Sequence, residues 1–227
     1  MKKPIIGIVC KQEKIRKKFS NVYIREEVKD AIIYNGGIPI GIINVNNDEY
    51  RVSDNWYYSY NDEDYKNLYE VLKLCDGVIF QGGNACSNYE MNICKYCYDL
   101  DIPVLGICCG ENVMVRCLGG TTKLVSNPDV HHQLNVEYVH SIKIKKNTKL
   151  YNIIKKEEIN VNSRHLKVVD TCPNLCVSAI DSDGNIECVE DKNKKFFIGL
   201  RFHPESLYLK DENMNNIFVA FIDACKK

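Results

Sequence analysis

Short apolar runs alternate with amphipathic segments through the first half of the chain. The runs that have the length and composition of β-strands are Ile5 to Val9, Ile38 to Ile43, Gly77 to Phe80 and Val104 to Ile107. Between them, apolar residues recur at helical spacing over Val22 to Asn35, Glu63 to Leu74 and Tyr89 to Leu100. This alternation predicts an α/β fold, with a mostly parallel central sheet that is covered by helices on both faces.

Strand signals dominate the second half of the chain. Short runs separated by turns are found at His140 to Lys145, Lys167 to Asp170, Val177 to Ile180, Ile186 to Glu190 and Phe196 to Leu200. A closing helix is expected at Met214 to Cys225. No linker or repeat interrupts the sequence, and 227 residues with 45% hydrophobic content suffice for one α/β core. We therefore expect a single domain over residues 1–227, with a small β-rich section in its C-terminal half.

A cysteine follows the fourth predicted strand. In the segment PVLGICCG, residues 103–110, Gly106 and Gly110 leave room for a sharp exit from the strand, and Cys108 lies in the turn. A helix that begins at about Gly110 would direct free N–H groups and its positive end toward the sulfur, which favours a thiolate. Cys108 is therefore a candidate nucleophile, although a cysteine in an apolar turn is more often a small core residue.

A histidine and a glutamate follow the last predicted strand, in the segment RFHPE. On a strand, side chains two residues apart point the same way, so Glu205 could orient the imidazole of His203. The chain thus supplies a nucleophile, a base and an orienting carboxylate in the order Cys108, His203, Glu205. A histidine beside a proline is also common in ordinary loops, so only the joint occurrence of the two segments points to a site.

The candidate residues all follow predicted strands. Gln81 to Gly83, Cys108 and His203 each come directly after an apolar run. In an open parallel sheet, ligands bind beyond the carboxyl ends of the strands. We expect these three segments to converge at that edge of the sheet.

The sequence resembles the class I glutamine amidotransferases, and within them the stand-alone branch typified by gamma-glutamyl-gamma-aminobutyrate hydrolase. The resemblance covers nearly the whole chain and implies a flavodoxin-like α/β fold. The segments that carry it are KKPIIGIVC, AIIYNGGIPIGI, DGVIFQGG, DIPVLGICCGENVMVRCLGGT, VNSRHLKVV and FFIGLRFHPES.

This resemblance implies a role for each residue of the candidate site. Cys108 would attack the gamma-carbonyl of a glutamine-like substrate, and water would cleave the resulting thioester. His203 would act as base and acid with Glu205 as its partner. The backbone N–H groups of Gly82 or Gly83 and of Cys109 would hold the oxyanion.

The sequence departs from the family pattern after the cysteine. The family commonly has glutamine at the position of Asn112, where it contacts the glutamyl end of the substrate, and Asn112 is one methylene shorter. Glu111 would repel an alpha-carboxylate if it pointed into the pocket, or it could be a solvated residue in the first helical turn. His165, in the NSRH segment, corresponds to a substrate-contact position of the hydrolase branch, although a plain loop histidine is the alternative.

Three functions are compatible with these residues. The first is a stand-alone hydrolase of gamma-glutamyl amides, which the NSRH segment and the absence of a synthetase domain favour. The second is a glutaminase subunit that delivers ammonia to a separate synthase partner. The third is a ligand-binding protein on the same scaffold without catalysis. The identity of the leaving amine is not encoded in any motif.

Composition and charge limit the partners and the compartment. Thirty basic and thirty acidic side chains cancel, which argues against a general nucleic-acid binder. The N-terminal MKKPIIGIVCKQEK is too short for a signal peptide or a membrane span, so we expect a cytoplasmic chain with reduced thiols. A homodimer is expected only because such dimers are the commonest oligomers.

No cofactor and no metal are expected from the spacing of the metal-binding residue types. Cys94 and Cys97 form a C-x-x-C without a second pair at zinc-finger spacing. The histidines, including His131, His132 and His140, lack acidic or cysteine partners close in sequence.

One long connection has no clear periodicity. Residues 44–64 are polar and rich in tyrosine. They could form a lid or specificity loop, or a solvated connection whose aromatic rings pack on the core.

Overall fold

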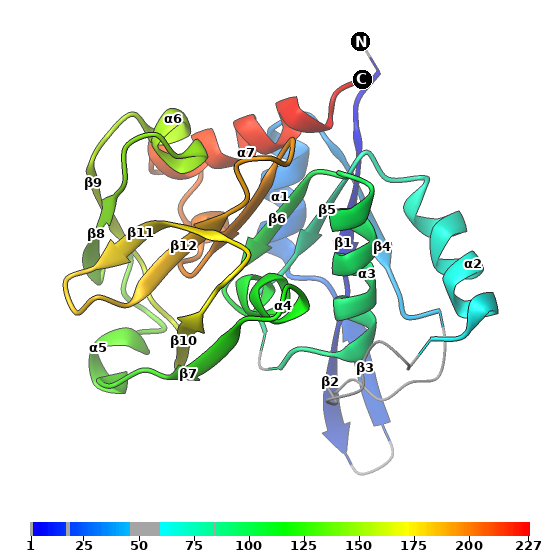
Figure 1. Cartoon of the computed structure of the whole chain (residues 1–227), viewed down its shortest axis with the longest axis horizontal. Coiled ribbons are helices and arrows are strands. Elements are labelled where there is room, and N and C mark those ends of the chain that lie inside the picture. The colour runs from blue at the N-terminus through cyan, green and yellow to red at the C-terminus, as the bar shows by residue number, and fades with distance from the viewer. Residues whose placement is uncertain (1, 17–18, 46–59, 84) are drawn as a thin grey trace.

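The fold is built on one mixed sheet, seen in a computed structural model that describes residues 2–16, 19–45, 60–83 and 85–227 (Figure 1). Five strands form its parallel half, and each hydrogen-bonds to the next in the spatial order β4-β1-β5-β6-β13. Their bounds are Ile38–Ile42 for β4, Ile5–Val9 for β1, Gly77–Phe80 for β5, Val104–Ile107 for β6 and Phe197–Leu200 for β13. The predicted α/β fold with a parallel central sheet is confirmed.

Antiparallel strands extend the sheet beyond β13. They continue in the order β12 (Ile186–Glu190), β11 (Cys176–Asp181), β8 (His140–Ile144) and β9 (Glu158–Val161). A branch is formed by β10 (Lys167–Thr171), which pairs with both β12 and β7 (Thr121–Leu124). This extension is the β-rich section expected for the C-terminal half.

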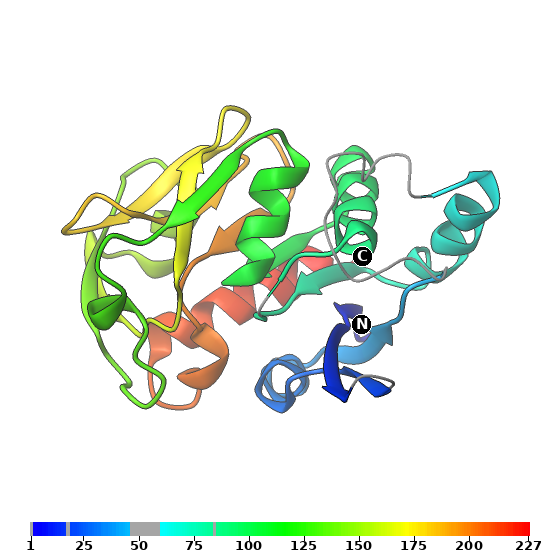
Figure 2. The same ribbon diagram turned by 90° about the horizontal axis from the view of Figure 1, so that it is seen from below.

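Helices cover both faces of the parallel strands (Figure 2). Alternate residues of β5 point to opposite sides, so that Ile79 packs in one apolar cluster and Val78 and Phe80 in the other. The helices that bury the first cluster are α1 (Glu26–Tyr34), α6 (Lys149–Ile154) and α7 (Glu212–Cys225). Those that bury the second are α2 (Asp62–Leu72), α3 (Asn88–Asp99) and α4 (Cys109–Cys117).

The first predicted helix is wrong at its start. Val22 belongs to an antiparallel hairpin formed by β2 (Lys11–Arg16) and β3 (Phe19–Tyr23), and α1 begins only at Glu26. The backbone N–H of Arg25 donates to Gln81 Oε1 at 2.8 Å, which fixes the chain as it enters the helix. The pairing between β2 and β3 therefore decides the structure of a segment whose apolar spacing also suits a helix.

Several elements of the second half were not anticipated. They are β7, α5 (Pro128–His131), α6, β9 and the 3-10 turn η2 (Pro204–Ser206). Of the polar segment 44–64, residues 46–59 lie outside the described residues, and 62–64 belong to α2. In the described part of the chain, no helix combines the length and the apolar character that crossing a bilayer requires.

Candidate active site

Three neighbouring parallel strands end at the candidate site. Phe80 of β5 is in register with Gly106 of β6, and Ile107 is in register with Leu200 of β13. The residues that follow these strands include Cys108 and His203, and they lie side by side at the carboxyl edge of the sheet. The expected convergence is thus what the structure shows.

The backbone turns sharply at Cys108. Its φ of 52° and ψ of −101° are unfavourable for a residue with a Cβ atom, and α4 begins at the next residue. A Cβ on Gly110 would lie 2.0 Å from the carbonyl oxygen of Phe80, so only glycine lets α4 approach β5 this closely. The strained turn raises Cys108 above the end of β6 at the N-terminus of the helix, as predicted.

The turn is held by the end of β13. The N–H of Cys108 donates to the carbonyl of Leu200 at 2.7 Å, and Nη1 of Arg201 donates to the carbonyl of Cys108 at 3.3 Å. Nη2 of Arg201 also donates to Oδ1 of Asn112 at 2.8 Å. Arg201 thereby ties the strained turn to the first turn of α4, a role that the RFHPE motif did not suggest.

His203 and Glu205 form a buried pair. Nδ1 of His203 lies 2.7 Å from Oε1 of Glu205, and both side chains are almost inaccessible to solvent. They do not lie on a strand, as the alternation argument assumed, because β13 ends at Leu200 and Glu205 belongs to the turn η2. Asn162 fixes the histidine instead. It accepts from the His203 N–H at 2.7 Å and donates to the His203 carbonyl at 2.8 Å.

The imidazole of His203 faces Cys108. A Cβ on Gly82 would lie 3.0 Å from Cε1 of His203 and 3.7 Å from Cβ of Cys108, so both side chains border the same glycine. Burial lowers the pKa of His203, but the negative charges of Glu205 and of the Cys108 sulfur outweigh it and raise the pKa to about 10. The imidazole is therefore held as a cation at neutral pH.

The glycine segment after β5 offers free backbone donors. No hydrogen bond is found for the N–H groups of Gly82, Gly83 and Cys109 within the described ranges, 46–59 and Asn84 lying outside them. Gln81 fixes the start of this segment, because its Nε2 donates to the carbonyls of Val9 at 3.0 Å and Tyr23 at 3.1 Å. This arrangement is compatible with the expected oxyanion donors.

Glu111 takes neither of the two orientations that the sequence suggested. It is fully buried, neither solvated nor turned into the pocket, and it forms an ion pair with the buried guanidinium of Arg201. Burial raises the pKa of Glu111 to about 7, although Arg201 opposes the shift. Gly199 of β13 has no side chain and so leaves space for Glu111. A Cβ at Gly199 would lie 2.9 Å from Cγ of Glu111.

A second thiol adjoins the candidate nucleophile. Sγ of Cys109 lies 3.4 Å from Nζ of Lys11 and 3.8 Å from Sγ of Cys86. The hydrogen bond from Cys86 and the charge of Lys11 outweigh the opposing effect of burial and lower the pKa of Cys109 to about 7. Lys11, buried itself, also pairs with Glu90 at 2.6 Å. Sequence spacing gave no signal for this cluster.

A cavity of about 670 Å³ opens beside Cys108. Asn112 and His165 both line it, and their contacts with a substrate stay predictions. Burial, followed by the charge of Arg201, lowers the pKa of His165 to about 2, so its imidazole is neutral. None of the lining side chains in the described part of the chain is acidic. The basic ones are Arg116, Arg164, Lys167 and Arg201.

The C-x-x-C pair lies away from this cavity. Cys94 and Cys97 are both fully buried on α3, where they pack in the apolar cluster with Cys117 of α4. Burial raises the pKa of both thiols. They are therefore positioned as core residues.

Comparison with known proteins gives a match of residues 85–205 to the Peptidase C26 family. The glutamine amidotransferase-like protein RP404 of Rickettsia prowazekii is 26% identical over 281 residues, and the alignment covers 99% of this chain and 98% of that protein. The residues matched to the family include Cys108, His165, His203 and Glu205.

Larger and structurally defined relatives are also similar. The glutamine-hydrolyzing GMP synthase of Agathobacter rectalis is 32% identical over 139 residues, which cover 60% of this chain but only 25% of that protein. The crystal structure of a glutamine amidotransferase from Thermotoga maritima superposes with a TM-score of 0.62 at 12% identity, over 100% of this chain and 100% of that one. The latter likeness establishes a shared fold.

Proposed function

The chain belongs to the Peptidase C26 family, within the class I glutamine amidotransferase superfamily, and from this premise we propose that it hydrolyses gamma-glutamyl amide bonds. The observation that carries the proposal is the arrangement of Cys108, His203 and Glu205 beside a cavity lined by basic groups. The products are glutamate and an amine.

The reaction would begin with attack of the Cys108 sulfur on the gamma-carbonyl carbon. The carbonyl oxygen becomes an oxyanion, to which the N–H groups of Gly82 or Gly83 and of Cys109 donate hydrogen bonds. The imidazolium of His203 donates its Nε2 proton to the leaving nitrogen as the carbon–nitrogen bond breaks. Water, deprotonated by the now neutral His203, then cleaves the gamma-glutamyl thioester and restores the Cys108 sulfur.

The supporting groups fit these steps. Glu205 fixes the tautomer of His203 and stabilises its charged form, as the 2.7 Å contact and the raised pKa indicate. Nε2 of His203 is buried and has no hydrogen-bond partner among the described residues, and the Cys108 sulfur is one of the groups that raise the pKa of this imidazole.

The charge of the cavity favours an acidic leaving group. Arg116, Arg164 and Lys167 line it together with the neutral amide of Asn112 and the neutral ring of His165. A substrate with two carboxylates, such as gamma-glutamyl-gamma-aminobutyrate or a gamma-glutamyl amino acid, carries one carboxylate at each end. These basic side chains could bind both carboxylates. We propose contacts from Asn112 and His165 to the glutamyl end.

A product assay tests this function. The purified protein is offered glutamine, gamma-glutamyl-gamma-aminobutyrate, gamma-glutamyl amino acids and neutral gamma-glutamyl alkylamides, and glutamate, ammonia and released amine are measured separately. Cleavage of the acidic amides above the neutral ones, lost in Cys108→Ala, is expected. Turnover that persists in Cys108→Ala would contradict the assignment of the nucleophile.

A glutaminase subunit is the second candidate. It is supported by the similarity to GMP synthases, of whose length the chain spans about a quarter in Agathobacter rectalis. Such a protein would release ammonia from glutamine slowly by itself and faster with its synthase partner. Preference for glutamine over every other gamma-glutamyl amide in the assay would select it. Tight binding of a gamma-glutamyl compound without any turnover would instead select a ligand-binding protein.

A further inference from the structure

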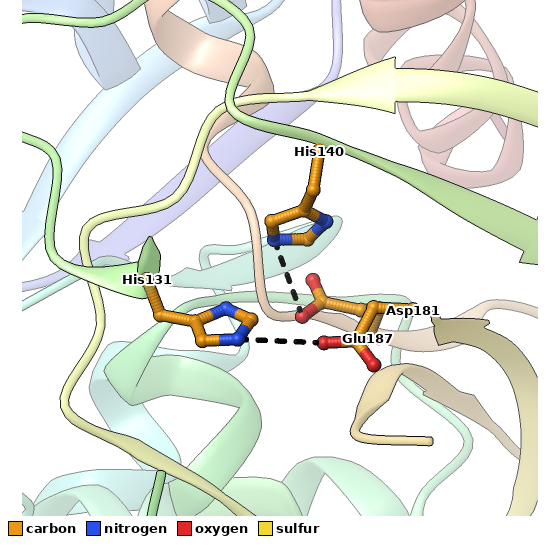
Figure 3. Close-up of side chains that lie close together, drawn as sticks. All are labelled: His131, His140, Asp181 and Glu187. Atoms are coloured by element: carbon orange, nitrogen blue, oxygen red, sulfur yellow. Dashed lines mark ion pairs between the residues drawn. The ribbon is translucent and has the colours of Figure 1, made fainter. Parts of the chain in front are cut away.

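Three histidines that are largely buried pack together, and one of them, His165, lines the cavity. His131 ends α5, His140 begins β8, and His165 follows β9. The rings of His131 and His165 stack with centroids 5.2 Å apart, and the ring of His140 meets His131 edge-on at 5.1 Å. Two carboxylates of the β11–β12 hairpin, Asp181 and Glu187, face these rings (Figure 3).

The spacing of these groups is too long for hydrogen bonds. Nε2 of His131 lies 3.7 Å from Oδ2 of Asp181, and Nε2 of His140 lies 3.8 Å from Oε1 of Glu187. Ligand atoms on a tetrahedral Zn²⁺ with bonds of about 2.0–2.1 Å lie about 3.4 Å apart. One ligand atom from each of the four residues falls within 4.8 Å of all the others. A small movement would therefore place all four around one ion.

Several buried polar atoms in the cluster lack hydrogen-bond partners among the described residues. Both oxygens of Glu187, both ring nitrogens of His131 and Nε2 of His140 make no hydrogen bond among the described residues. Glu187 is fully buried. A buried carboxylate without a donor costs free energy that an ion at the cluster would offset.

The outer contacts orient two of the residues for ligation. Nδ1 of His140 donates to the carbonyl of Ser141 at 3.3 Å, which leaves Nε2 with its lone pair directed at the cluster. Oδ1 of Asp181 accepts from the N–H groups of Asp183 and Asn185 at 2.9 and 2.8 Å, which fixes its carboxylate in the hairpin turn.

We propose that His131, His140, Asp181 and Glu187 bind a divalent transition-metal ion, and that this ion is Zn²⁺. Two imidazoles and two carboxylates form a donor set that Zn²⁺ accepts in four-coordinate geometry. The two carboxylates come from a hairpin far along the chain from His131 and His140, so the spacing around the histidines gave no signal for them.

The ion would support the cavity wall and take no part in the reaction. The carbonyl of His131 accepts from Oγ of Ser163 at 2.7 Å and from the N–H of His165 at 3.1 Å. His165 lines the cavity. Ligation of His131 would therefore fix the segment that presents His165, and metal removal is expected to raise KM more than it lowers kcat.

Metal content and coordination test the proposal without reference to activity. The full-length protein is treated with a chelator, dialysed, reloaded with Zn²⁺ or Co²⁺ and analysed by elemental mass spectrometry. About one ion per chain is expected, with a melting temperature that rises with free metal concentration. X-ray absorption is expected to show a shell of nitrogen and oxygen at about 2.0–2.2 Å without sulfur at about 2.3 Å.

Matched variants locate the ion. Glu187→Gln and His140→Gln keep the shape of the side chains, or nearly so, and are expected to lose the bound metal. Glu158→Gln, an exposed carboxylate on β9, and His132→Asn, a neighbouring exposed histidine, are expected to keep it. A sulfur shell in the wild type, full retention by Glu187→Gln, or no uptake by folded wild-type protein would each overturn the proposal. The wild-type spectrum decides the question even if both ligand variants fail to fold.

Discussion

The guanidinium of Arg201 pairs with the carboxylate of Glu111 inside the protein and also donates to the carbonyl of Cys108. Both side chains are almost completely buried. A buried ion pair is compatible with a stable fold only while both partners are present. Loss of one partner leaves the other charge buried and unpaired. Arg201 also supports the backbone of Cys108, so this ion pair links the stability of the protein to the geometry of its candidate nucleophile.

Removal of either member of this pair should therefore be costly. Arg201→Ala or Glu111→Ala is expected to lower the free energy of unfolding by about 3–5 kcal/mol. The double variant Glu111→Ala/Arg201→Ala should lose less than the sum of the single losses, because no unpaired charge is left. Urea unfolding measures all three. Glu137→Ala, which breaks the exposed pair with Lys210, is the control and should change little. Additive losses would contradict the coupling.

The raised pKa of His203 predicts an alkaline limit to both activity and stability. Because its folded pKa of about 10 exceeds the unfolded value of about 6.5, its stabilising contribution is complete below about pH 6.5 and is lost as pH rises toward 10. Proton donation from His203 to the leaving nitrogen should fail as the pH approaches and passes about 10, where the imidazole loses its proton. In Glu205→Gln, the alkaline limb of kcat/KM should move to lower pH, since the Glu205 charge is the largest effect that raises this pKa. An unmoved limb would separate Glu205 from the titration.

Cys109 should react with small alkylating reagents at neutral pH. In the Cys108→Ala background, its rate of carbamidomethylation is expected to rise around pH 7, where its thiol ionises. Lys11→Met should move this midpoint upward because it removes the neighbouring positive charge. Mass spectrometry of the peptide that contains Cys109, sampled over time and pH, gives the rates. Equal midpoints in the two proteins would show that Lys11 does not influence the thiol.

Asn162 should act through the position of His203. Asn162→Ala removes both hydrogen bonds to the His203 backbone and is expected to lower kcat on the order of 10²-fold, with a smaller change in KM. Steady-state kinetics on the preferred gamma-glutamyl amide provide the measurement. Asn174→Ala, which removes the bond to the Leu118 carbonyl at an exposed position, serves as the control. Equal losses of kcat in the two variants would indicate a general effect of destabilisation.

The parallel strands were predictable from sequence because each is a short apolar run bounded by turn residues. β1, β5 and β6 have the predicted bounds, since burial on both faces requires continuous apolar side chains. The hairpin of β2 and β3 was missed because its pairing is not recorded in the periodicity of either strand alone. The strand β9, EINV, was missed for a different reason. Only two of its residues are buried, so its apolar signal is short.

The site was partly predictable. Cys108, His203 and Glu205 stand out because each follows a strand and because the family resemblance assigns them roles, and the structure places them together. Arg201, Lys11 and Asn162 gave no such signal. Their partners, such as Glu90 for Lys11 and the His203 backbone for Asn162, lie far away in sequence and meet them only in the folded sheet.

The end of β13 carries both sides of the proposed chemistry. Leu200 and Arg201 bind the backbone of Cys108 on either side of its strained turn, and His203 follows two residues later. The end of β13 therefore holds the backbone of Cys108 and leads directly into His203. The separation of the two reacting groups thus depends on the end of this one strand, with Asn162, just after the outer strand β9, as a second anchor for His203.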